Sequence, residues 1–366
     1  MPSGRAEHRC DAVRDHDMDW DQFHRQGEGK DMRRHGRETT SARYQRPRGT
    51  SVVLFAALVL FAGLLSQCSS GGGADLPGRI PINTATGWSD SPSISRDGQR
   101  LYFMYSRYDF GPWIKSGGTT TLVPSGPDRP GLHHSANPWD ESDIYMAVKR
   151  SDGTWSEAVN LGLNGAYGDA SGMEIDGGNT FIWLQGNGSG NDIVMASKAP
   201  DGTWNSPVSL GAGVNDHTGG VFQDNPHLSP DGQGLWFTSN RAGGAGARDI
   251  WFSLYTGGSW TTPVNMGSPF NTDGEEDQIW ITPTGPTPEI YWNASDGLKR
   301  CTWNGSACST PEIITIPGCS YAAEVSITDD GQYLYFGCGD LTTGRVSIMY
   351  SVKQLDGSWG QATPVD

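Results

Sequence analysis

Short apolar runs separated by glycine-rich turns recur along the chain from about residue 88 to the C-terminus. In GLWFTSN (234–240) Leu235 and Phe237 are two residues apart, as are Ile250 and Phe252 in DIWFSLY. A period of two places alternate side chains on opposite faces of a β-strand. Long apolar stripes with the 3.6-residue period of a helix are absent from the sequence. The pattern therefore predicts many short strands and few helices.

These strands belong to a repeat. Segments of the form SPDGxxLxF, DIxxx and DGxWxxPVNLG follow one another in the same order, with a spacing of about fifty residues, which is typical of propellers and solenoids. The landmark position after the last turn is occupied in five copies by Trp155, Trp204, Trp260, Ala307 (in place of tryptophan) and Trp359.

Each copy resolves into four strands. In the copy that starts at Asp224 these are NPHLS, GLWFTSN, DIWFSLY and WTTPVNMG, and Asp-Gly or Gly-Gly turns join the first to the second and the third to the fourth. A four-stranded meander cannot bury both faces alone, so such sheets pack around an axis. We predict an all-β fold, a five-bladed β-propeller of four-stranded antiparallel blades; a two-sheet sandwich explains the period less well.

The way in which the ring closes is open. RIPINTATG (Arg79–Gly87) resembles the PVNLG segment of a fourth strand and could complete the last blade. The C-terminal GQATPVD could form the same fourth strand. One of the two segments must lie elsewhere.

The N-terminal part has the composition of a leader. An apolar run (52–65) follows several arginines and ends in LLSQC, which resembles a bacterial lipoprotein signal with Cys68 as the lipidated residue. Gln67 stands where a small residue is expected, so a plain signal peptide or a single anchor helix remains an alternative, and Met32 could be the true start. We expect a leader (1–68), a flexible tether (69–78) and the propeller (79–366).

Cysteines outside the leader are even in number, which fits an exported chain with disulfides. Asn304-Gly305 is a favoured hairpin turn pair, and two cysteines flank it symmetrically. A zinc site is the alternative, but the spacing is not that of a metal knuckle and no histidine is near. We predict two disulfides, Cys301–Cys308 and Cys319–Cys338.

The net charge of −15 restricts the partners. It argues against nucleic acid and anionic lipid headgroups, and it fits neutral glycans, cations or basic protein surfaces. We expect a monomer that binds a glycan or an envelope protein and meets the membrane only through an N-terminal lipid. We expect no cofactor, with a structural cation such as calcium as the alternative.

The repeat SPDGxxLxFTSNRxxGxxDIW resembles the TolB-like, WD-type propeller repeat of bacterial envelope proteins. The resemblance covers residues 88–366 and is strongest in the copies at Asp90 and Asp224. It implies a propeller exported to the cell envelope, periplasmic or extracellular. It implies little about activity, because propellers host many functions.

Variable gaps between the second and third strands should gather at one end of the propeller, here called the loop face. The longest gap (108–141) should form a lid or wall there, with Trp113, His133, His134 and Trp139 as candidate ligand contacts. The two histidines could bind metal or carry protons, or could be a solvated pair. Trp88 and Trp280 also fall outside the repeated tryptophan register and are further candidates for stacking on a sugar.

Acidic residues recur at the start of the innermost strands and should surround the mouth of the central tunnel. They could bond backbone amides between blades, bind a glycan or a cation, or supply the acid and base of glycosidic cleavage. The five are Asp90, Asp169, Asp224, Asp277 and Glu324.

WSDSPSISRDG (Trp88–Gly98) is similar to the first blade of five-bladed glycoside hydrolases of the arabinanase type, with one residue inserted between Asp and Pro. That resemblance implies a furanosidase-type hydrolase with Asp90 as base. Asp224 and either Glu276 or Glu324 would be the modulator and proton donor. No later repeat carries a clear acid motif of that family.

Overall fold

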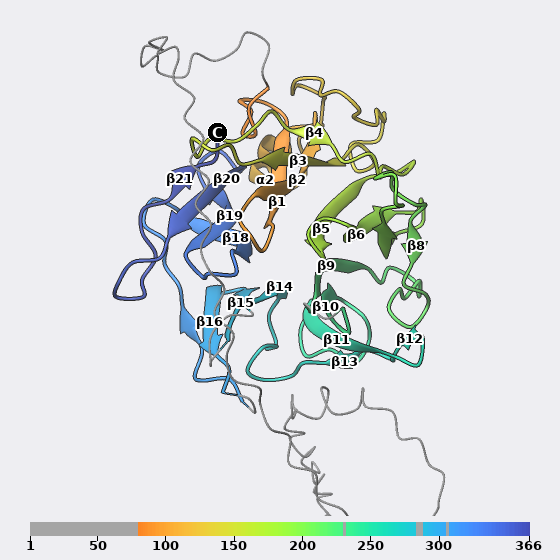
Figure 1. Cartoon of the computed structure of the whole chain (residues 1–366), viewed down its shortest axis with the longest axis vertical. Helices are drawn as coiled ribbons and strands as arrows, with labels where there is room; N and C mark the ends of the chain where they lie inside the picture. Colours follow the sequence, from red (N-terminus) through yellow and green to blue (C-terminus); the bar gives the residue numbers. More distant parts are fainter. Residues whose placement is uncertain (1–79, 230–231, 283–287, 305–306) are drawn as a thin grey trace, which may run out of the picture. The chain divides into compact units, whose positions relative to one another are not determined.

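The computed structural model describes residues 80–366, apart from 230–231, 283–287 and 305–306. Within them five antiparallel sheets of four principal strands follow one another along the chain, which confirms the predicted five-bladed propeller (Figure 1). Blade 1 contains β1 (Trp88–Ile94), β2 (Arg100–Ser106), β3 (Asp143–Val148) and β4 (Val159–Asn160). Blade 2 contains β5 (Asp169–Ile175), β6 (Thr180–Gly186), β7 (Asn191–Ser197) and β8 (Val208–Ser209).

The remaining blades repeat this order. Blade 3 contains β9 (Gln223–Leu228), β10 (Gly234–Ser239), β11 (Asp249–Thr256), β12 (Ser259–Trp260) and β13 (Val264–Asn265). Blade 4 contains β14 (Glu276–Ile281), β15 (Glu289–Ala294), β16 (Gly297–Thr302) and β17 (Glu312–Ile313). Blade 5 contains β18 (Tyr321–Ile327), β19 (Tyr333–Asp340), β20 (Arg345–Val352) and β21 (Thr363–Pro364). A short helix, α2 (Gly111–Lys115), lies in the β2–β3 loop.

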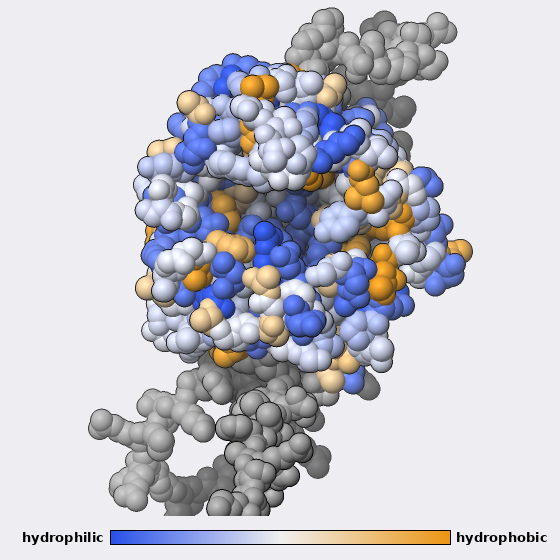
Figure 2. Space-filling view, turned by 180° about the vertical axis from the view of Figure 1, so that it is seen from behind, coloured by the Kyte–Doolittle hydropathy of each residue, from blue (hydrophilic) through white to orange (hydrophobic). Residues whose placement is uncertain are grey.

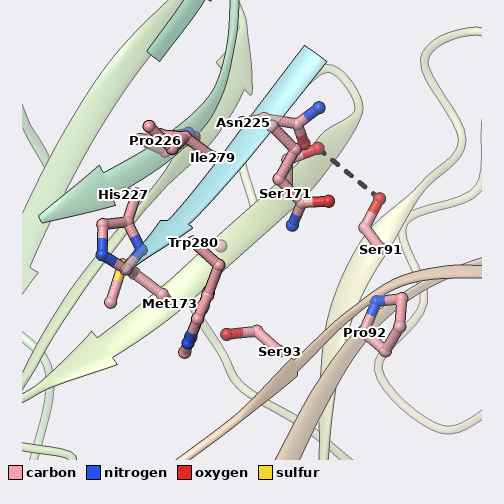
Figure 3. Close-up of a pocket in the computed structure, with 12 residues that line it drawn as sticks. Ser91, Pro92, Ser93, Ser171, Met173, Asn225, Pro226, His227, Ile279 and Trp280 are labelled. Carbon is pink, nitrogen blue, oxygen red and sulfur yellow. Dashed lines mark hydrogen bonds between the residues drawn. The ribbon is translucent and has the colours of Figure 1, made fainter. Parts of the chain in front are cut away.

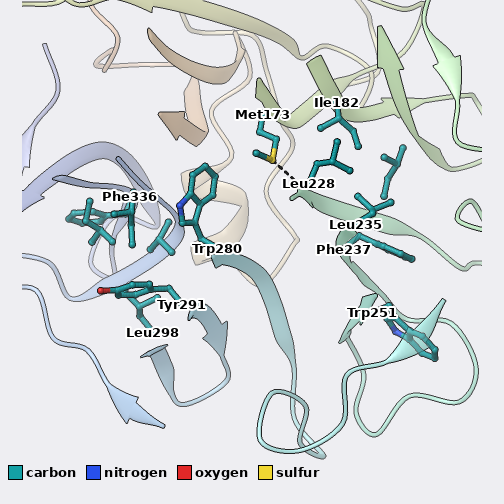
Figure 4. Packing of buried hydrophobic residues seen from close by; sticks show 14 of the residues in the cluster. Met173, Ile182, Leu228, Leu235, Phe237, Trp251, Trp280, Tyr291, Leu298 and Phe336 are labelled. Carbon is teal, nitrogen blue, oxygen red and sulfur yellow. Dashed lines mark hydrogen bonds between the residues drawn. The ribbon is translucent and has the colours of Figure 1, made fainter. Parts of the chain in front are cut away.

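The first strand of each blade lies innermost. Neighbouring first strands contact one another in the order β1, β5, β9, β14 and β18, and β18 contacts β1 again, so the ring is closed. Buried side chains fill the space between blades, among them Met173, Leu228, Trp280 and Phe336 from four different blades (Figure 4). The core is therefore continuous around much of the ring, and it fixes the inner strands that carry the candidate site.

Asparagine side chains bond the segments between blades to the third strand of the preceding blade. GQATPVD supplies β21, and the segment before β1 takes the position of a blade-to-blade connection. Asn83 accepts a hydrogen bond from Ile348 N (2.7 Å) and donates to Ile348 O (2.8 Å) and Val365 O (2.9 Å). Asn215 and Asn271 bond the third strands of their own blades in the same way. The question left open by the sequence is answered: the fourth strand of every blade comes from the same stretch of chain as the other three.

The last turn of each blade carries the landmark residue. Trp155 pairs across its turn with Lys149 and packs on Tyr335 of blade 5 at a ring distance of 6.0 Å. In blade 4 the residue that pairs across this turn is Cys308, opposite Trp303, so the position assigned to Ala307 belongs to Cys308. Both predicted disulfides, Cys301–Cys308 and Cys319–Cys338, are confirmed.

The leader and tether, including Cys68, lie outside the described residues. Among the helices that the structure describes, none is long and apolar enough to cross a membrane.

Candidate ligand-binding site at the mouth of the central channel

One residue in each inner strand has a left-handed backbone although it is not glycine. Each interrupts the pairing of the first and second strands as a bulge. Non-glycine residues with positive φ are uncommon, and five in equivalent positions motivate a functional hypothesis for this level of the channel. The five are Ser91 (φ 52°), Ser171 (48°), Asn225 (46°), Gln278 (35°) and Glu324 (53°).

The bulges show which acidic residues occupy equivalent positions in the different blades. Asp90, Asp224 and Asp277 immediately precede the bulge in their blades, whereas Glu324 is itself the bulge residue. Asp169 lies one residue earlier and is buried, with its carboxylate bonded by Trp183 Nε1 (2.8 Å), Gln185 Nε2 (3.1 Å) and Gly165 N (2.8 Å).

Glu276 occupies the same early position as Asp169 and is also buried. Its two oxygens accept hydrogen bonds from the backbone and hydroxyl of Thr272. The structure therefore brings Asp90, Asp224, Asp277 and Glu324 together at the mouth. It leaves Asp169 and Glu276 in the wall, bonded by the protein itself.

Asp90 and Glu324 form a carboxyl pair between blades 1 and 5. Glu324 Oε2 accepts from Ser91 N (2.8 Å), and Asp90 Oδ2 accepts from Trp88 Nε1 (3.1 Å). Burial raises the pKa of Asp90. Burial, followed by the charge of Asp90, raises the pKa of Glu324 well above its usual range. Adjacent carboxylates cannot both ionise cheaply, so the pair holds a proton to higher pH than isolated carboxyls would.

Asp224 and Asp277 form the second group, on blades 3 and 4. Burial, and then the charge of Asp277, raises the pKa of Asp224 to about 6. Asp277 is held by Asn225 Nδ2 (2.7 Å), Thr238 Oγ1 (2.8 Å) and Arg248 Nη1 (3.1 Å). Arg248 forms an ion pair with Asp277, and the charge of Asp277 is the second cause of the raised pKa of Asp224.

An aromatic row leads from this mouth to the surface. Trp88, which bonds Asp90, contacts Phe110 at a ring distance of 5.7 Å; Phe110 contacts Trp139 at 5.1 Å, and Trp139 contacts Trp113 at 5.1 Å. Trp88 is buried, whereas Trp139 is 56% exposed. Ion pairs of Arg107 with Glu141 and of Arg345 with Asp109 hold the loop that carries this row. The long β2–β3 loop thus forms one wall of the mouth.

The other candidates from this loop have local partners. His134 Nε2 lies 2.8 Å from Asp128 Oδ1, with both side chains exposed. The backbone N–H of His133 donates to Asp143 Oδ2 (2.5 Å). Trp280, predicted near the loop face, is buried below the mouth.

A small cavity lies on the axis below the carboxylates. Its volume is about 20 Å³, close to that of one water site. Side chains from blades 1 to 4 line it, including Ser91, Ser171 and Gln278 of the bulge level and His227 below (Figure 3). One hydrogen bond across it joins Ser91 Oγ and Ser171 Oγ (3.5 Å). His227 contacts Trp280 edge to face at 4.8 Å.

Sequence reasoning missed His227 and Phe110. His227 lies two residues after a bulge, in a segment that reads as an ordinary strand, and Phe110 acquires its role only when the long loop folds.

The space-filling view shows a central hollow with hydrophilic residues around it (Figure 2). Among the described residues, no group of three or more His, Cys, Asp or Glu side chains is placed to hold a metal ion.

No protein-family model matches this chain. No curated protein matches it either. Solved structures do resemble it. A thermostable family-43 glycoside hydrolase has 11% identity over 79% of this chain and 97% of its own, with a TM-score of 0.49. The GH43_1 enzyme from Xanthomonas citri, solved with xylose, has 12% identity over 79% and 94%, with a TM-score of 0.46.

TolB from Acinetobacter baumannii has 14% identity over 75% of this chain and 68% of its own, with a TM-score of 0.40. Likeness at these values concerns the fold alone, and the activities of those proteins carry no weight for this one. The chain is a five-bladed β-propeller that resembles both TolB and family-43 glycoside hydrolases in fold, as its repeats predicted.

Proposed function

We propose that this protein is an exported propeller that binds a glycan on its loop face. The aromatic row from exposed Trp139 to Trp88, which ends at Asp90, is the observation that carries the proposal. Apolar faces of sugar rings stack on aromatic side chains, and carboxylates accept hydrogen bonds from sugar hydroxyls. Tyr321, 47% exposed at the start of β18, offers a second aromatic surface near the mouth.

Compartment and anchoring are part of the proposal. The two disulfides suit an oxidising environment such as the periplasm or the cell exterior. We propose that Cys68 carries the lipid. If so, Cys68→Ala will move the protein from the membrane fraction to the soluble fraction, and recovery of the variant in the membrane fraction would contradict lipid anchoring at this residue.

A second candidate function is glycoside hydrolysis, and the group of four acidic side chains at the mouth, where burial and the charge of Asp277 raise the pKa of Asp224 to about 6, favours it. A glycosidase needs one carboxyl that keeps its proton and one that is ionised, separated by roughly 5 to 9.5 Å. Asp90 and Glu324 are in contact, so they cannot flank a scissile bond as acid and base. The acid and the base would therefore come from different groups, one from Asp90 or Glu324 and the other from Asp224 or Asp277.

A glycan screen on the purified protein separates the candidates, read for binding and for released reducing ends. Release that is abolished in Asp224→Asn identifies a hydrolase, whereas binding without release identifies a capture protein. In either case Trp139→Ala should weaken binding roughly two- to tenfold, the worth of one stacking contact. Tyr255→Ala, an exposed aromatic residue beside the last turn of blade 3, is the matched control. If no glycan binds, glycan recognition is wrong and a protein partner replaces it.

A further inference from the structure

The connection between blades 4 and 5 differs from the other connections in one residue. Each connection contains a buried apolar residue, and an asparagine follows it in every connection but this one. Three of these asparagines bond the third strand of the preceding blade, and Asn164 donates to Gly131 O (3.1 Å). The pairs are Ile82 and Asn83, Leu163 and Asn164, Val214 and Asn215, Phe270 and Asn271, and Ile316 and Pro317. Pro317 has no side-chain amide, so the connection to blade 5 lacks this hydrogen bond.

A disulfide holds this connection instead. Cys319 lies two residues after Pro317, and its partner Cys338 belongs to β19 of blade 5. Pro317 O also accepts a hydrogen bond from Ala362 N of blade 5 (2.8 Å). The connection is thus attached to the blade that follows it, partly through a covalent bond that a reductant can break.

A cleft borders the same connection and limits how much packing can hold it. The cleft has a volume of about 270 Å³, and it is lined by Ile314 and Thr315 together with Ser358 and Trp359 of the last turn of blade 5. Atoms that face such a space lose the dispersion contacts of a filled core. The disulfide therefore contributes a larger share of the attachment here than it would beside closely packed blades.

The disulfide lies directly beside Tyr321 at the mouth. Tyr321 begins β18, and the next residue, Ala322, is paired with Cys338 across the β18–β19 ladder. Cys319 Sγ lies 3.2 Å from Tyr321 O. The two sulfur atoms therefore fix the start of β18 from both of its neighbours, the connection before it and the strand beside it.

The rest of β18 has a separate attachment, to blade 4. Asn293 of β15 donates to Ala322 O (3.0 Å) and accepts from Glu324 N (3.0 Å). These bonds do not depend on the disulfide, so Glu324 stays at the rim without it. Tyr321 precedes them in the chain, and its position depends on the disulfide.

The two disulfides differ in their exposure to reagents. Cys319 and Cys338 are both half-buried, whereas Cys301 of the other disulfide is 1% exposed. A thiolate must reach a sulfur atom to attack it. A dithiol that attacks here forms a mixed disulfide and frees one protein thiol, and its second thiol then displaces the other protein sulfur. The protein gains two electrons and two protons, and the reagent leaves as a cyclic disulfide.

We propose that Cys319–Cys338 replaces the asparagine bond of the other connections, and that its reduction by a dithiol releases residues 314–321 together with the ring of Tyr321. The connection becomes mobile while the rim acids keep their places. Tyr321 is one of the exposed aromatic surfaces at the mouth, so reduction also weakens glycan binding. This last consequence rests on the proposed function, whereas the release itself does not.

Hydrogen exchange on the full chain tests the release, with and without dithiothreitol. The Cys301→Ala/Cys308→Ala variant is used, because it leaves Cys319–Cys338 as the disulfide of the described residues. Reduction should accelerate exchange at residues 314–321 about tenfold and leave residues 210–216, the connection with Asn215, nearly unchanged. The Cys319→Ala/Cys338→Ala variant is the control: its exchange at 314–321 should be fast with or without the reagent.

Pro317→Asn tests whether the disulfide stands in for an asparagine. Added to Cys319→Ala/Cys338→Ala, it restores the amide that the other connections carry and should slow exchange at residues 314–321 again. Exchange that stays fast would show that the two devices are not equivalent and would overturn that part of the proposal. Exchange at 314–321 that does not respond to dithiothreitol would overturn the release.

Titration calorimetry tests the consequence for the mouth, with cellohexaose or the tightest-binding oligosaccharide of the glycan screen as the probe. Reduction should weaken binding roughly two- to tenfold, the worth of one stacking contact, and reoxidation should restore it. In Tyr321→Ala reduction should leave the affinity unchanged. Faster exchange without any loss of affinity would show that Tyr321 does not contact the glycan. A screen in which no glycan binds removes the proposed function, and the exchange measurements still decide the release.

Discussion

At the scale of single residues, Glu324 is the clearest case of a side chain whose ionised form destabilises the fold. Its carboxyl lies beside Asp90, and burial and repulsion raise its pKa. A carboxyl whose folded pKa is raised stabilises the fold most at low pH, and this contribution is lost as pH rises above the unfolded value toward the folded one. The pair is therefore a source of instability at neutral and alkaline pH, retained at the mouth of the channel.

Glu324→Gln should consequently raise the melting temperature by a few degrees at pH values above neutrality and change it little below pH 4.5, the ordinary value for glutamate. The amide keeps an oxygen that can accept from Ser91 N, so the local bond survives. Melting curves across the pH range check this. Asp340→Asn is a control of opposite sign: hydrogen bonds from Thr342 lower the pKa of Asp340 to about 2, so that variant should be less stable at neutral pH. A stabilising effect of Glu324→Gln that is the same at every pH would exclude the charge explanation.

At the scale of elements, the hydrogen bonds of Asn83 determine how stably the segment before β1 is attached to blade 5. Asn83→Ala removes one acceptor and two donor contacts and leaves backbone groups of Ile348 and Val365 without these partners. We expect a loss of about 1–3 kcal/mol in the free energy of unfolding, measured by denaturant. Asn215→Ala breaks equivalent bonds and should cost a similar amount.

The two variants should differ in local protection. Hydrogen exchange at residues 80–87 should accelerate in Asn83→Ala, because within the described residues a blade follows this segment in sequence and none precedes it. The connection around Asn215 is held by blades on both sides and should remain protected. Equal protection of the two segments would show that other contacts close the ring.

The disulfides offer a second test at this scale. Cys319–Cys338 closes a longer loop than Cys301–Cys308, with sequence separations of 19 and 7. In the chain-entropy model the longer loop contributes about 3 kcal/mol and the shorter about 2. Two double Cys→Ala variants, one for each disulfide, can be compared by denaturant unfolding. The variant that lacks Cys319 and Cys338 should therefore lose more free energy of unfolding than the variant that lacks Cys301 and Cys308. The reverse order would show that packing of Cys301, which is 1% exposed, outweighs loop closure.

At the scale of the whole molecule, the sequence predicted the architecture well because the turn residues and the period of two repeat in every blade. It predicted the mouth less well. Asp169 stands seven residues before the Asp of its turn, as Asp90 does, yet it lies two residues before the bulge residue instead of one. Glu324 stands one residue nearer to its turn, at the position of Ser91, and is itself the bulge residue. The bulge residues are Ser, Asn, Gln and Glu, and no glycine marks their left-handed backbones. His227 and Phe110 depend on contacts between distant segments, which spacing cannot show.

The adjacency of the two ends of the propeller has a consequence for protein engineering. Asn83 bonds Val365 O, so a short glycine linker from residue 366 to residue 80 should join the ends without strain. New termini opened after Asn215 should then give a circular permutant that melts within a few degrees of the parent. An opening at Gly98 would separate an inner strand from its blade and should cost far more. If both hold, the junction after Asn215 can serve as the beginning of this protein, and a sensor or tag could be attached there without cutting into a blade.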